Sequence, residues 1–216
     1  MTDKQMVIAC QALCASRNDN VLTAPVSCTV AKGDYIQLRG PNGCGKSTFL
    51  RHLAGLLPAI KGTIIIAGEP CPAQDIPALR TISYLGHDDA MQADLTGYEN
   101  YELLTGQSRN MLVQSSLYER QIATYSAGQR QKLSLHILDD SHDIWLLDEP
   151  SASLDAANLA YLEERIAGYL ALGGAVIAST HTPLAQSLIS QIITLTPAAP
   201  DAAPDAAQEA AEEARL

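Results

Sequence analysis

The sequence has few of the features that mark membrane-spanning or nucleic-acid-binding proteins. No apolar run approaches the roughly 18–20 residues that a membrane helix needs, so other chains would have to supply any membrane spans. Only 14 Lys and Arg stand against 24 Asp and Glu, and the net charge of −10 argues against binding to nucleic acid or anionic lipid. Aromatic residues make up only 5% of the chain, so we expect a core of mostly Leu, Ile, Val and Ala. The opening residues Met1–Gln5 do not resemble a signal peptide.

Cysteine is also scarce, and its spacing does not indicate a metal site. The five cysteines are odd in number and form neither a CxxC pair nor a cluster with histidine, so we expect neither zinc nor a disulfide framework. We expect reduced cytoplasmic thiols, mostly buried, at Cys10, Cys14, Cys28, Cys44 and Cys71.

Short apolar runs alternate with helical stretches along the chain. Ile144–Leu147 and Ala175–Ala178 are apolar throughout, which is typical of strands buried on both faces of a parallel sheet. Leu159–Leu172 between them predicts a helix that ends at Gly173. This order implies a right-handed crossover and an α/β fold with a mostly parallel sheet. Further strands are expected at Tyr35–Arg39, Thr63–Ala67 and Ile82–Leu85.

The composition divides the chain into three parts. The length of 216 residues suffices for one well-buried domain, which we expect over residues 1–196. Leu95–Leu117 has no strand pattern, so we interpret residues of about 88–138 as an inserted helical subdomain. Residues 197–216 are rich in Ala, Pro, Asp and Glu and cannot bury a core, so we expect a flexible tail.

A glycine-rich loop matches the phosphate-binding pattern G-x-x-x-x-G-K-[ST] between a predicted strand and a helix over about Lys46–Leu57. Glycines let backbone N–H groups approach phosphates closely, and the helix N-terminus adds positive charge. We expect Lys46 to reach the β- and γ-phosphates of a nucleotide, Ser47 to bind Mg²⁺ and Thr48 to contact the α-phosphate. Cys44 either merely fits the loop or would block nucleotide entry once alkylated or oxidised. The predicted nucleotide-binding loop comprises Gly40, Pro41, Asn42, Gly43, Cys44, Gly45, Lys46, Ser47 and Thr48.

Two adjacent carboxylates follow the apolar strand that starts at Ile144. A buried strand rarely ends in two acids unless their charge is used. We expect Asp148 to hold Mg²⁺ through water, opposite Ser47, and Glu149 to act as the general base on the attacking water. Trp145 is expected to pack in the core.

The segment Ser126–Gln129 opens a predicted helix about 20 residues before Asp148. Its sequence, SAGQ, resembles the LSGGQ signature of ATP-binding-cassette (ABC) proteins, with Tyr125 in place of the Leu. Ser153–Asp155 resembles the D-loop of that family, and His181 resembles its switch histidine. The resemblance implies that the Ser126 hydroxyl and the Gly128 amide contact the γ-phosphate held by the opposite subunit, and that Gln129 belongs to the same nucleotide-binding signature.

This resemblance covers residues 5–196 and implies the P-loop NTPase fold of the ABC type. That fold has a mostly parallel sheet, an antiparallel β part and a short inserted helical subdomain. It also implies hydrolysis of ATP with Mg²⁺ by a homodimer, in which each ATP lies between the phosphate loop of one subunit and the signature of the other. The catalytic residues would be Lys46, Glu149 and His181.

Three positions depart from the family pattern. His87 stands where a metal-contacting Gln is expected; it could replace that Gln only when neutral, and Asp88 is the alternative metal ligand. The aromatic residue that stacks on adenine is missing, and Arg17 could stack there through its guanidinium plane. Ala152 stands at the first place of the usual D-loop S-A-L-D.

Several local sequences are similar to those of ATPases in the bacterial haem exporter of cytochrome c maturation. They are Leu85–His87, the SAGQ signature, Ile144–Pro150 and Thr180–Leu184. The similarity implies a membrane permease as partner and a peripheral location on the cytoplasmic face of the inner membrane. We expect the chain itself to bind no haem, because three of its histidines form no ligand set and are expected at the surface or in helices: His52, His136 and His142.

Other functions remain open at the level of sequence. An ATPase of the same fold could drive another cargo, or serve as a soluble assembly ATPase without a permease. A nucleotide-binding subunit without hydrolysis is a third alternative, against which Glu149 and His181 argue.

Overall fold

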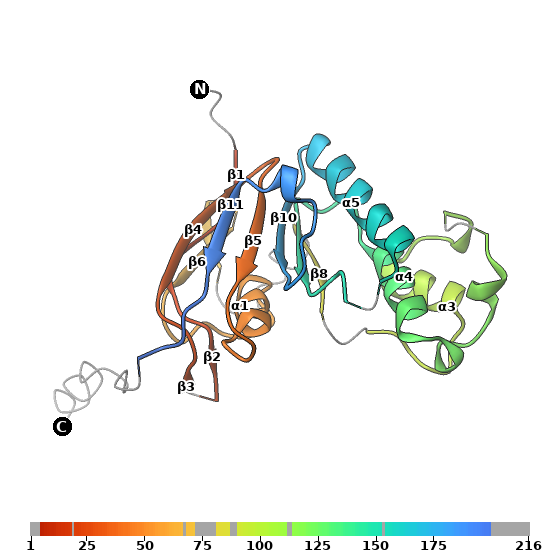
Figure 1. The fold of residues 1–216 in the computed structure, drawn as a ribbon, viewed down its shortest axis with the longest axis horizontal. Coiled ribbons are helices and arrows are strands. Elements are labelled where there is room, and N and C mark those ends of the chain that lie inside the picture. Colours follow the sequence, from red (N-terminus) through yellow and green to blue (C-terminus); the bar gives the residue numbers. More distant parts are fainter. Residues whose placement is uncertain are drawn as a thin grey trace.

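Five parallel strands form the main sheet of the protein (Figure 1). The structure is a computed structural model and describes residues 5–18, 20–66, 68–71, 81–86, 90–111, 114–152 and 154–199. The strand order is β11-β5-β10-β9-β8, and all neighbouring pairs are parallel. These strands are β5 (Tyr35–Arg39), β8 (Ile82–Leu85), β9 (Ile144–Asp148), β10 (Ala175–Ser179) and β11 (Gln191–Thr194). The predicted mostly parallel sheet is therefore confirmed.

The central strands β9 and β10 are buried along their whole length, which explains their unbroken apolar sequences. The edge strand β11 is different, because only Ile193 of its four residues is buried. A strand this short and exposed has no clear apolar pattern, and the sequence did not predict it.

A smaller antiparallel sheet has the order β4-β1-β6-β7. Its strands are β1 (Met6–Leu13), β4 (Val26–Ala31), β6 (Thr63–Ile66) and β7 (Glu69–Pro70). The expected antiparallel part is present and contains the strand predicted at Thr63–Ala67. A two-stranded hairpin extends from this part between β1 and β4, formed by β2 (Ser16–Arg17) and β3 (Asn20–Val21).

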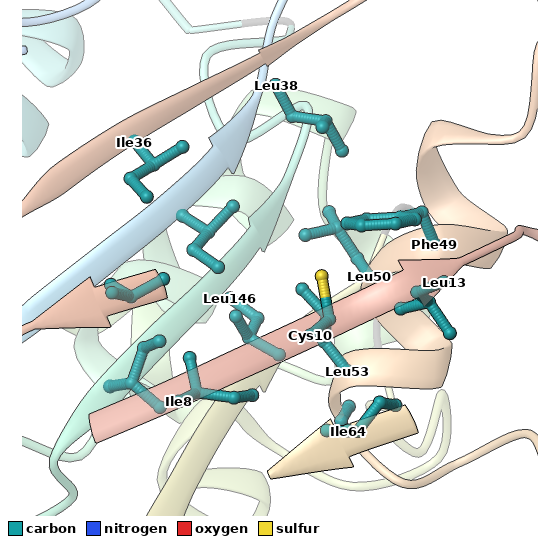
Figure 2. Packing of buried hydrophobic residues seen from close by; sticks show 14 of the residues in the cluster. Ile8, Cys10, Leu13, Ile36, Leu38, Phe49, Leu50, Leu53, Ile64 and Leu146 are labelled. Carbon is teal, nitrogen blue, oxygen red and sulfur yellow. The ribbon is translucent and has the colours of Figure 1, made fainter. Parts of the chain in front are cut away.

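Helix α1 (Lys46–Leu53) packs in a shared apolar core between the two sheets (Figure 2). Phe49, Leu50 and Leu53 of the helix meet Leu13 of the antiparallel sheet and Leu146 of the parallel sheet. Burying these side chains contributes about 1.5–3 kcal/mol each relative to exposure. The phosphate-binding loop before α1 is therefore anchored to both sheets.

The opposite face of the parallel sheet is covered by α5 (Ala156–Ala171), which follows β9 (Figure 1). Trp145 stacks on Tyr169 of this helix, with ring centroids 3.9 Å apart and planes inclined by 4°. The Trp145 indole N–H donates a hydrogen bond to the carbonyl oxygen of Asp139 at 3.1 Å. The prediction that Trp145 packs in the core is confirmed.

The segment between β8 and β9 forms a separate helical region at the end of the molecule away from the antiparallel sheet (Figure 1). It contains α3 (Gly97–Thr105) and α4 (Ala127–Ile137), with short 3₁₀ turns at Arg109–Met111, Ser116–Glu119 and Ile122–Thr124. Within the described residues of the predicted helical stretch Leu95–Leu117, the α-helix thus covers only Gly97–Thr105.

The buried core as a whole is mostly Leu, Ile, Val and Ala, as expected, but this helical region has an aromatic core. Its buried cluster combines two aliphatic side chains with four tyrosines: Tyr98, Tyr101, Tyr118, Tyr125, Ile122 and Leu133. A low overall content of aromatic residues therefore does not exclude a local cluster of them, here in the helical region.

Two further predictions concern membrane spans and the tail. Among the described residues, no helix is both long and apolar enough to cross a membrane. Pro197 pairs with Thr23, and the N–H of Ala198 donates to the carbonyl oxygen of Leu22 at 2.9 Å. These contacts involve the first two residues of the predicted tail, and residues 200–216 of that tail lie outside the described residues.

Candidate active site at the carboxyl edge of the parallel sheet

The loop between β5 and α1 folds around the ammonium group of Lys46. Lys46 Nζ donates hydrogen bonds to the carbonyl oxygens of Gly40 at 3.1 Å and Pro41 at 3.3 Å. Gly45, directly before α1, has φ 102°, and a Cβ atom there would lie 3.3 Å from Cβ of Leu22. A residue with a side chain would be strained in this conformation and crowded by its neighbour. Glycine therefore lets the hairpin side of the molecule close against the start of the helix.

Asp148 ends β9 at the same edge of the parallel sheet, because the carboxyl ends of parallel strands coincide. Its Oδ1 accepts a hydrogen bond from the Ser179 hydroxyl at 2.7 Å. Its Oδ2 is buried and accepts no hydrogen bond within the described residues. A buried carboxylate oxygen without a donor is costly unless a cation or water satisfies it, and Mg²⁺ prefers oxygen ligands. The acid fits the predicted role of a magnesium ligand.

Glu149 adopts a left-handed backbone conformation, with φ 51°. This conformation is uncommon for residues other than glycine and often marks functional sites. The Glu149 N–H donates to the carbonyl oxygen of Ser179 at 3.0 Å and to its hydroxyl at 3.1 Å, which holds the turn in place.

The Glu149 carboxylate faces His181, which follows the neighbouring strand β10 by two residues. The backbone N–H of His181 donates to Oε2 at 3.4 Å, and the ring Nε2 lies 3.2 Å from Oε1. The ring approach lacks hydrogen-bond geometry, so the buried Oε1 is left without a donor among the described residues. Such an oxygen can accept a hydrogen bond from a water molecule and polarise it.

A cleft of about 640 Å³ brings most of the predicted residues together. It joins the phosphate loop, the two carboxylates and the histidine with the β2–β3 hairpin. Its lining comprises Arg17, Leu22, Asn42, Gly43, Gly45, Lys46, Ser47, Thr48, Arg51, Asp148, Glu149 and His181.

Three residues of the predicted loop, Gly40, Pro41 and Cys44, are not among those that line the cleft. The Cys44 side chain is buried in the core between the two sheets. This position favours the interpretation that Cys44 merely fits the loop over the one in which its modification blocks nucleotide entry.

A second pocket of about 570 Å³ lies between β8, α3 and α4. Its lining is mostly apolar, with Leu56, Tyr84, Met91 and Leu104 among its members, and includes no residue of the phosphate loop. The chemistry expected of Lys46 and the carboxylates therefore belongs to the other cleft.

His52 joins helix α1 to the β2–β3 hairpin beside the cleft, a structural role that the sequence did not reveal. It was expected at the surface or in a helix; it does lie in α1, but it is only 1% exposed. The Ser16 N–H donates to His52 Nε2 at 3.1 Å, and His52 Nδ1 lies 3.1 Å from the carbonyl oxygen of Leu57. The histidine therefore ties α1 to the hairpin that carries Arg17. The helical period could have revealed this, because His52 lies three residues after the apolar Phe49.

The signature residues are not part of this cleft. Ser126 caps α4, where its Oγ accepts a hydrogen bond from the Gln129 N–H at 3.2 Å, and the Ser126 N–H donates to Oε1 of Gln129 at 3.0 Å. Gly128 lies in the first turn of the same helix. Within one chain the structure therefore separates Ser126, Gly128 and Gln129 from the phosphate loop.

Two predicted features lie wholly or partly outside the described residues. His87, proposed as a metal ligand, lies outside them, and so does Ser153 of the predicted D-loop. Asp155 of that loop is described: its Oδ1 accepts a hydrogen bond from the Asn158 N–H at 2.8 Å and caps α5.

Comparison with known proteins identifies the family. Residues 23–152 match the family described as ABC transporter, a span that runs from the hairpin to the predicted D-loop. The chain belongs to the ABC transporter family. This ABC chain is 34% identical over 200 residues to the "Cytochrome c biogenesis ATP-binding export protein CcmA" of Rhodobacter capsulatus, covering 88% of each chain. It is 35% identical over 206 residues to the protein of the same name from Xanthomonas campestris, covering 89% of this chain and 95% of the other.

Solved structures of ABC proteins share the fold. An ATP-binding cassette described as a dimer in a post-hydrolysis state with ADP and Pi superposes with a TM-score of 0.74, at 20% identity, over 88% of this chain and 94% of the other. An ATP-binding subunit of an ABC transporter gives a TM-score of 0.73 at 22% identity, over 97% of this chain and all of the other. The predicted ABC-type fold is confirmed.

Proposed function

We propose that this ABC chain is the ATP-hydrolysing subunit of an exporter of cytochrome c biogenesis. The observation that carries the proposal is the single cleft that unites Lys46, Asp148, Glu149 and His181. These residues lie at or beyond the carboxyl ends of three neighbouring strands of one sheet, and their chemistry suits the hydrolysis of a nucleoside triphosphate with a divalent cation.

Binding of the triphosphate rests on the loop before α1. The Lys46 ammonium group now donates to two loop carbonyl oxygens and can instead donate to the β- and γ-phosphates. The Thr48 hydroxyl takes the α-phosphate. Arg17 and Leu22 on the hairpin side of the cleft form a surface against which the base can rest, in place of the aromatic residue that the sequence lacks.

The cation would be held by Ser47 and Asp148, whose Oδ2 has no other donor among the described residues. When bound, Mg²⁺ neutralises the charge that develops on the phosphate oxygens. His87 remains a predicted further ligand.

Hydrolysis requires a base beside the γ-phosphate, and Glu149 is the base we propose. Its carboxylate takes a proton from water as the water oxygen bonds to the γ-phosphorus and the bond from that phosphorus to the β,γ-bridging oxygen breaks. His181, in contact with both carboxylate oxygens, orients Glu149 and donates toward the transferring phosphoryl group. The products are ADP and inorganic phosphate.

Two copies of the chain are needed in this proposal, since the signature lies outside the cleft of its own chain. The N-terminus of α4 offers backbone N–H groups and a positive dipole end to the γ-phosphate held by the other copy. Each nucleotide is then enclosed by the phosphate loop of one subunit and by Ser126, Gly128 and Gln129 of its partner.

A complementation experiment tests the shared site. Lys46→Ala and Ser126→Arg subunits should each be inactive alone, because every site in either homodimer lacks one half. Mixed in equal amounts, half of the dimers contain one intact site of two, so roughly a quarter of the wild-type ATPase activity should return. Activity in either homodimer equal to that of the wild type would contradict the proposal.

The relatives and the family resemblance of the sequence support a cargo and a location. The CcmA proteins are named as export proteins of cytochrome c biogenesis, and we propose that this chain drives the export of haem in the same process. It would do so bound to a membrane permease at the cytoplasmic face of the inner membrane.

Purification of the chain from native membranes tests the cargo. We expect a permease and a haem-handling membrane protein to co-purify with it. Recovery of a peptide or metal permease would overturn the haem assignment but leave the ATPase assignment intact, and recovery only from the soluble fraction would favour an assembly ATPase.

A further inference from the structure

Two cysteines that are far apart in the sequence face each other across the antiparallel sheet. Cys10 of β1 and Cys28 of β4 are direct partners in the strand register. Their sulfur atoms lie 3.4 Å apart and share a hydrogen bond in which either thiol can be the donor. In such a directly opposed pair the Cα atoms are about 4.5–5.5 Å apart, within the range that disulfides span.

The two thiols differ in their surroundings. Cys10 is 2% exposed, and its side chain points into the core beside Leu50 (Figure 2). Cys28 is only partly buried and belongs to β4, an edge strand of the sheet. A small solute can therefore reach Cys28 while Cys10 stays behind it.

The contact between the sulfurs acts in opposite directions on the two thiols. The hydrogen bond from Cys28 lowers the pKa of the Cys10 thiol, against the opposing effect of burial. The same hydrogen bond, together with burial, raises the pKa of the Cys28 thiol. A thiolate is the reactive form of cysteine, and the proton can pass along the hydrogen bond to leave the charge on either sulfur.

We propose that Cys10 and Cys28 are a reversible oxidation site, converted to a disulfide by hydrogen peroxide. The proposed hydrolysis gives no role to either residue, and neither residue lines the nucleotide cleft.

The reaction balances with peroxide as the two-electron oxidant. The Cys28 sulfur passes its proton to the Cys10 thiolate as it attacks one peroxide oxygen, the O–O bond breaks, and a sulfenic acid forms while hydroxide leaves as water after protonation. The Cys10 sulfur then attacks the Cys28 sulfur, the S–O bond breaks, and a second water leaves. Two thiols and one peroxide thus give one disulfide and two waters. The sulfurs must approach by about 1.4 Å to reach the bonded distance, which a modest rotation of each side chain provides.

The bond would close a loop that contains the β2–β3 hairpin. Arg17 of this hairpin and Leu22, the residue directly after it, line the nucleotide cleft, so the bond would close the segment that carries one side of the cleft. Closing a loop of this length restricts the unfolded chain and should raise the thermal unfolding midpoint by about 5 °C or more.

Peptide mapping of the full-length chain tests the proposal. Trypsin should release residues 5–17 and 18–32, so a Cys10–Cys28 bond joins two peptides that are otherwise separate. Because residues 5–17 also contain Cys14, the experiment uses a Cys14→Ser parent. After treatment with hydrogen peroxide we expect the joined peptide, with a mass about 2 Da below the sum of the two, and its disappearance with dithiothreitol.

Matched variants complete the test. Cys28→Ser in the same parent should abolish the joined peptide, whereas Cys71→Ser, which removes another partly buried thiol, should leave it unchanged. The proposal fails if peroxide converts Cys28 to sulfinic acid while Cys10 remains a free thiol, or if no joined peptide forms. An unfolding midpoint that rises in the Cys28→Ser variant as well would likewise contradict it.

Discussion

Glu149 combines a strained backbone with an unsatisfied carboxylate oxygen, and both properties concern one residue of the cleft. The left-handed conformation of a residue with a side chain costs of the order of 1–3 kcal/mol. The two hydrogen bonds from its N–H to Ser179 hold that conformation. The strained turn directs the carboxylate toward His181.

Replacement of Glu149 by Gln should separate binding from hydrolysis. Glutamine keeps the size and the backbone requirement but cannot take a proton, so we expect the ATPase rate to fall by about 10²–10⁴-fold while ATP affinity is retained. The rate of phosphate release and the binding of a fluorescent ATP analogue measure the two effects. Glu164→Gln on the exposed face of α5 is the control and should be close to wild type. A Glu149→Gln enzyme that hydrolyses ATP normally would exclude this carboxylate as the base.

His136 shows a different kind of perturbation, away from the cleft. Burial lowers its pKa to about 4, with the positive charges of Arg165 and Lys132 acting in the same direction. Its Nδ1 lies 3.2 Å from the Tyr161 hydroxyl, which joins α4 to α5. The imidazole is therefore neutral in the folded protein at neutral pH.

This histidine should make stability depend on pH. Between its ordinary pKa of 6.5 and the folded value of about 4, the unfolded chain binds more protons than the folded chain, so stability falls as the pH is lowered through that window. Thermal unfolding midpoints at pH 7 and pH 5 should therefore differ more for the wild type than for His136→Gln. Equal losses in the two proteins would show that His136 does not contribute.

At the scale of elements, helices α3 and α4 begin with the same N-terminal capping motif. Thr96 and Glu99 form a capping box at α3, and Ser126 and Gln129 form one at α4. Each box satisfies backbone N–H groups that the first turn leaves without partners. The two boxes differ in sequence context, because only the second lies in the signature.

The two capping boxes can be compared by matched substitutions. Thr96→Ala and Ser126→Ala should each lower the free energy of unfolding by about 1 kcal/mol, measured by urea denaturation. Only Ser126→Ala should also reduce the ATPase rate, because only its hydroxyl is expected to reach a nucleotide. Similar ATPase rates for the two variants would indicate that Ser126 is purely structural.

At the scale of the whole molecule, the phosphate loop and the signature lie in different regions of one chain (Figure 1). The cleft is built between the two sheets and their hairpin, whereas α4 belongs to the helical region beyond β8. A second copy is the simplest way for a signature to reach a bound nucleotide.

Dimerisation should therefore depend on nucleotide and on α4. Glu149→Gln with ATP and Mg²⁺ should elute with the mass of a dimer in light scattering, because ATP stabilises the closed state and is not consumed. The double variant with Ser126→Arg should elute mostly at the monomer mass under the same conditions, since a bulky cation would then block both sites of the dimer. A mixed dimer with a Lys46→Ala subunit keeps one unblocked site and can still close. A monomeric Glu149→Gln protein at saturating ATP would contradict the sandwich arrangement.

The sequence alone identified most of the cleft, because that part of the chemistry is encoded by adjacent residues. The phosphate loop and the Asp148–Glu149 pair are contiguous motifs, each attached to a strand whose apolar pattern is unmistakable. The parallel sheet followed from the same patterns. Strands as short and exposed as β2, β3 and β11 escaped prediction, since two to four residues carry too little periodicity. The longer strands β1 and β4 of the antiparallel sheet were not predicted either.

Tertiary structure alone decided which distant residues meet. His52 and Ser16 are 36 positions apart, and Cys10 and Cys28 are 18 apart; strand register and helix packing bring each pair together. The Asp148 oxygen without a donor is likewise visible only once Ser179 is in place. Local motifs depend on residues that are neighbours in the chain, so the sequence alone predicts them. These contacts instead depend on how the two sheets pack around one core, and no local sequence pattern specifies that packing.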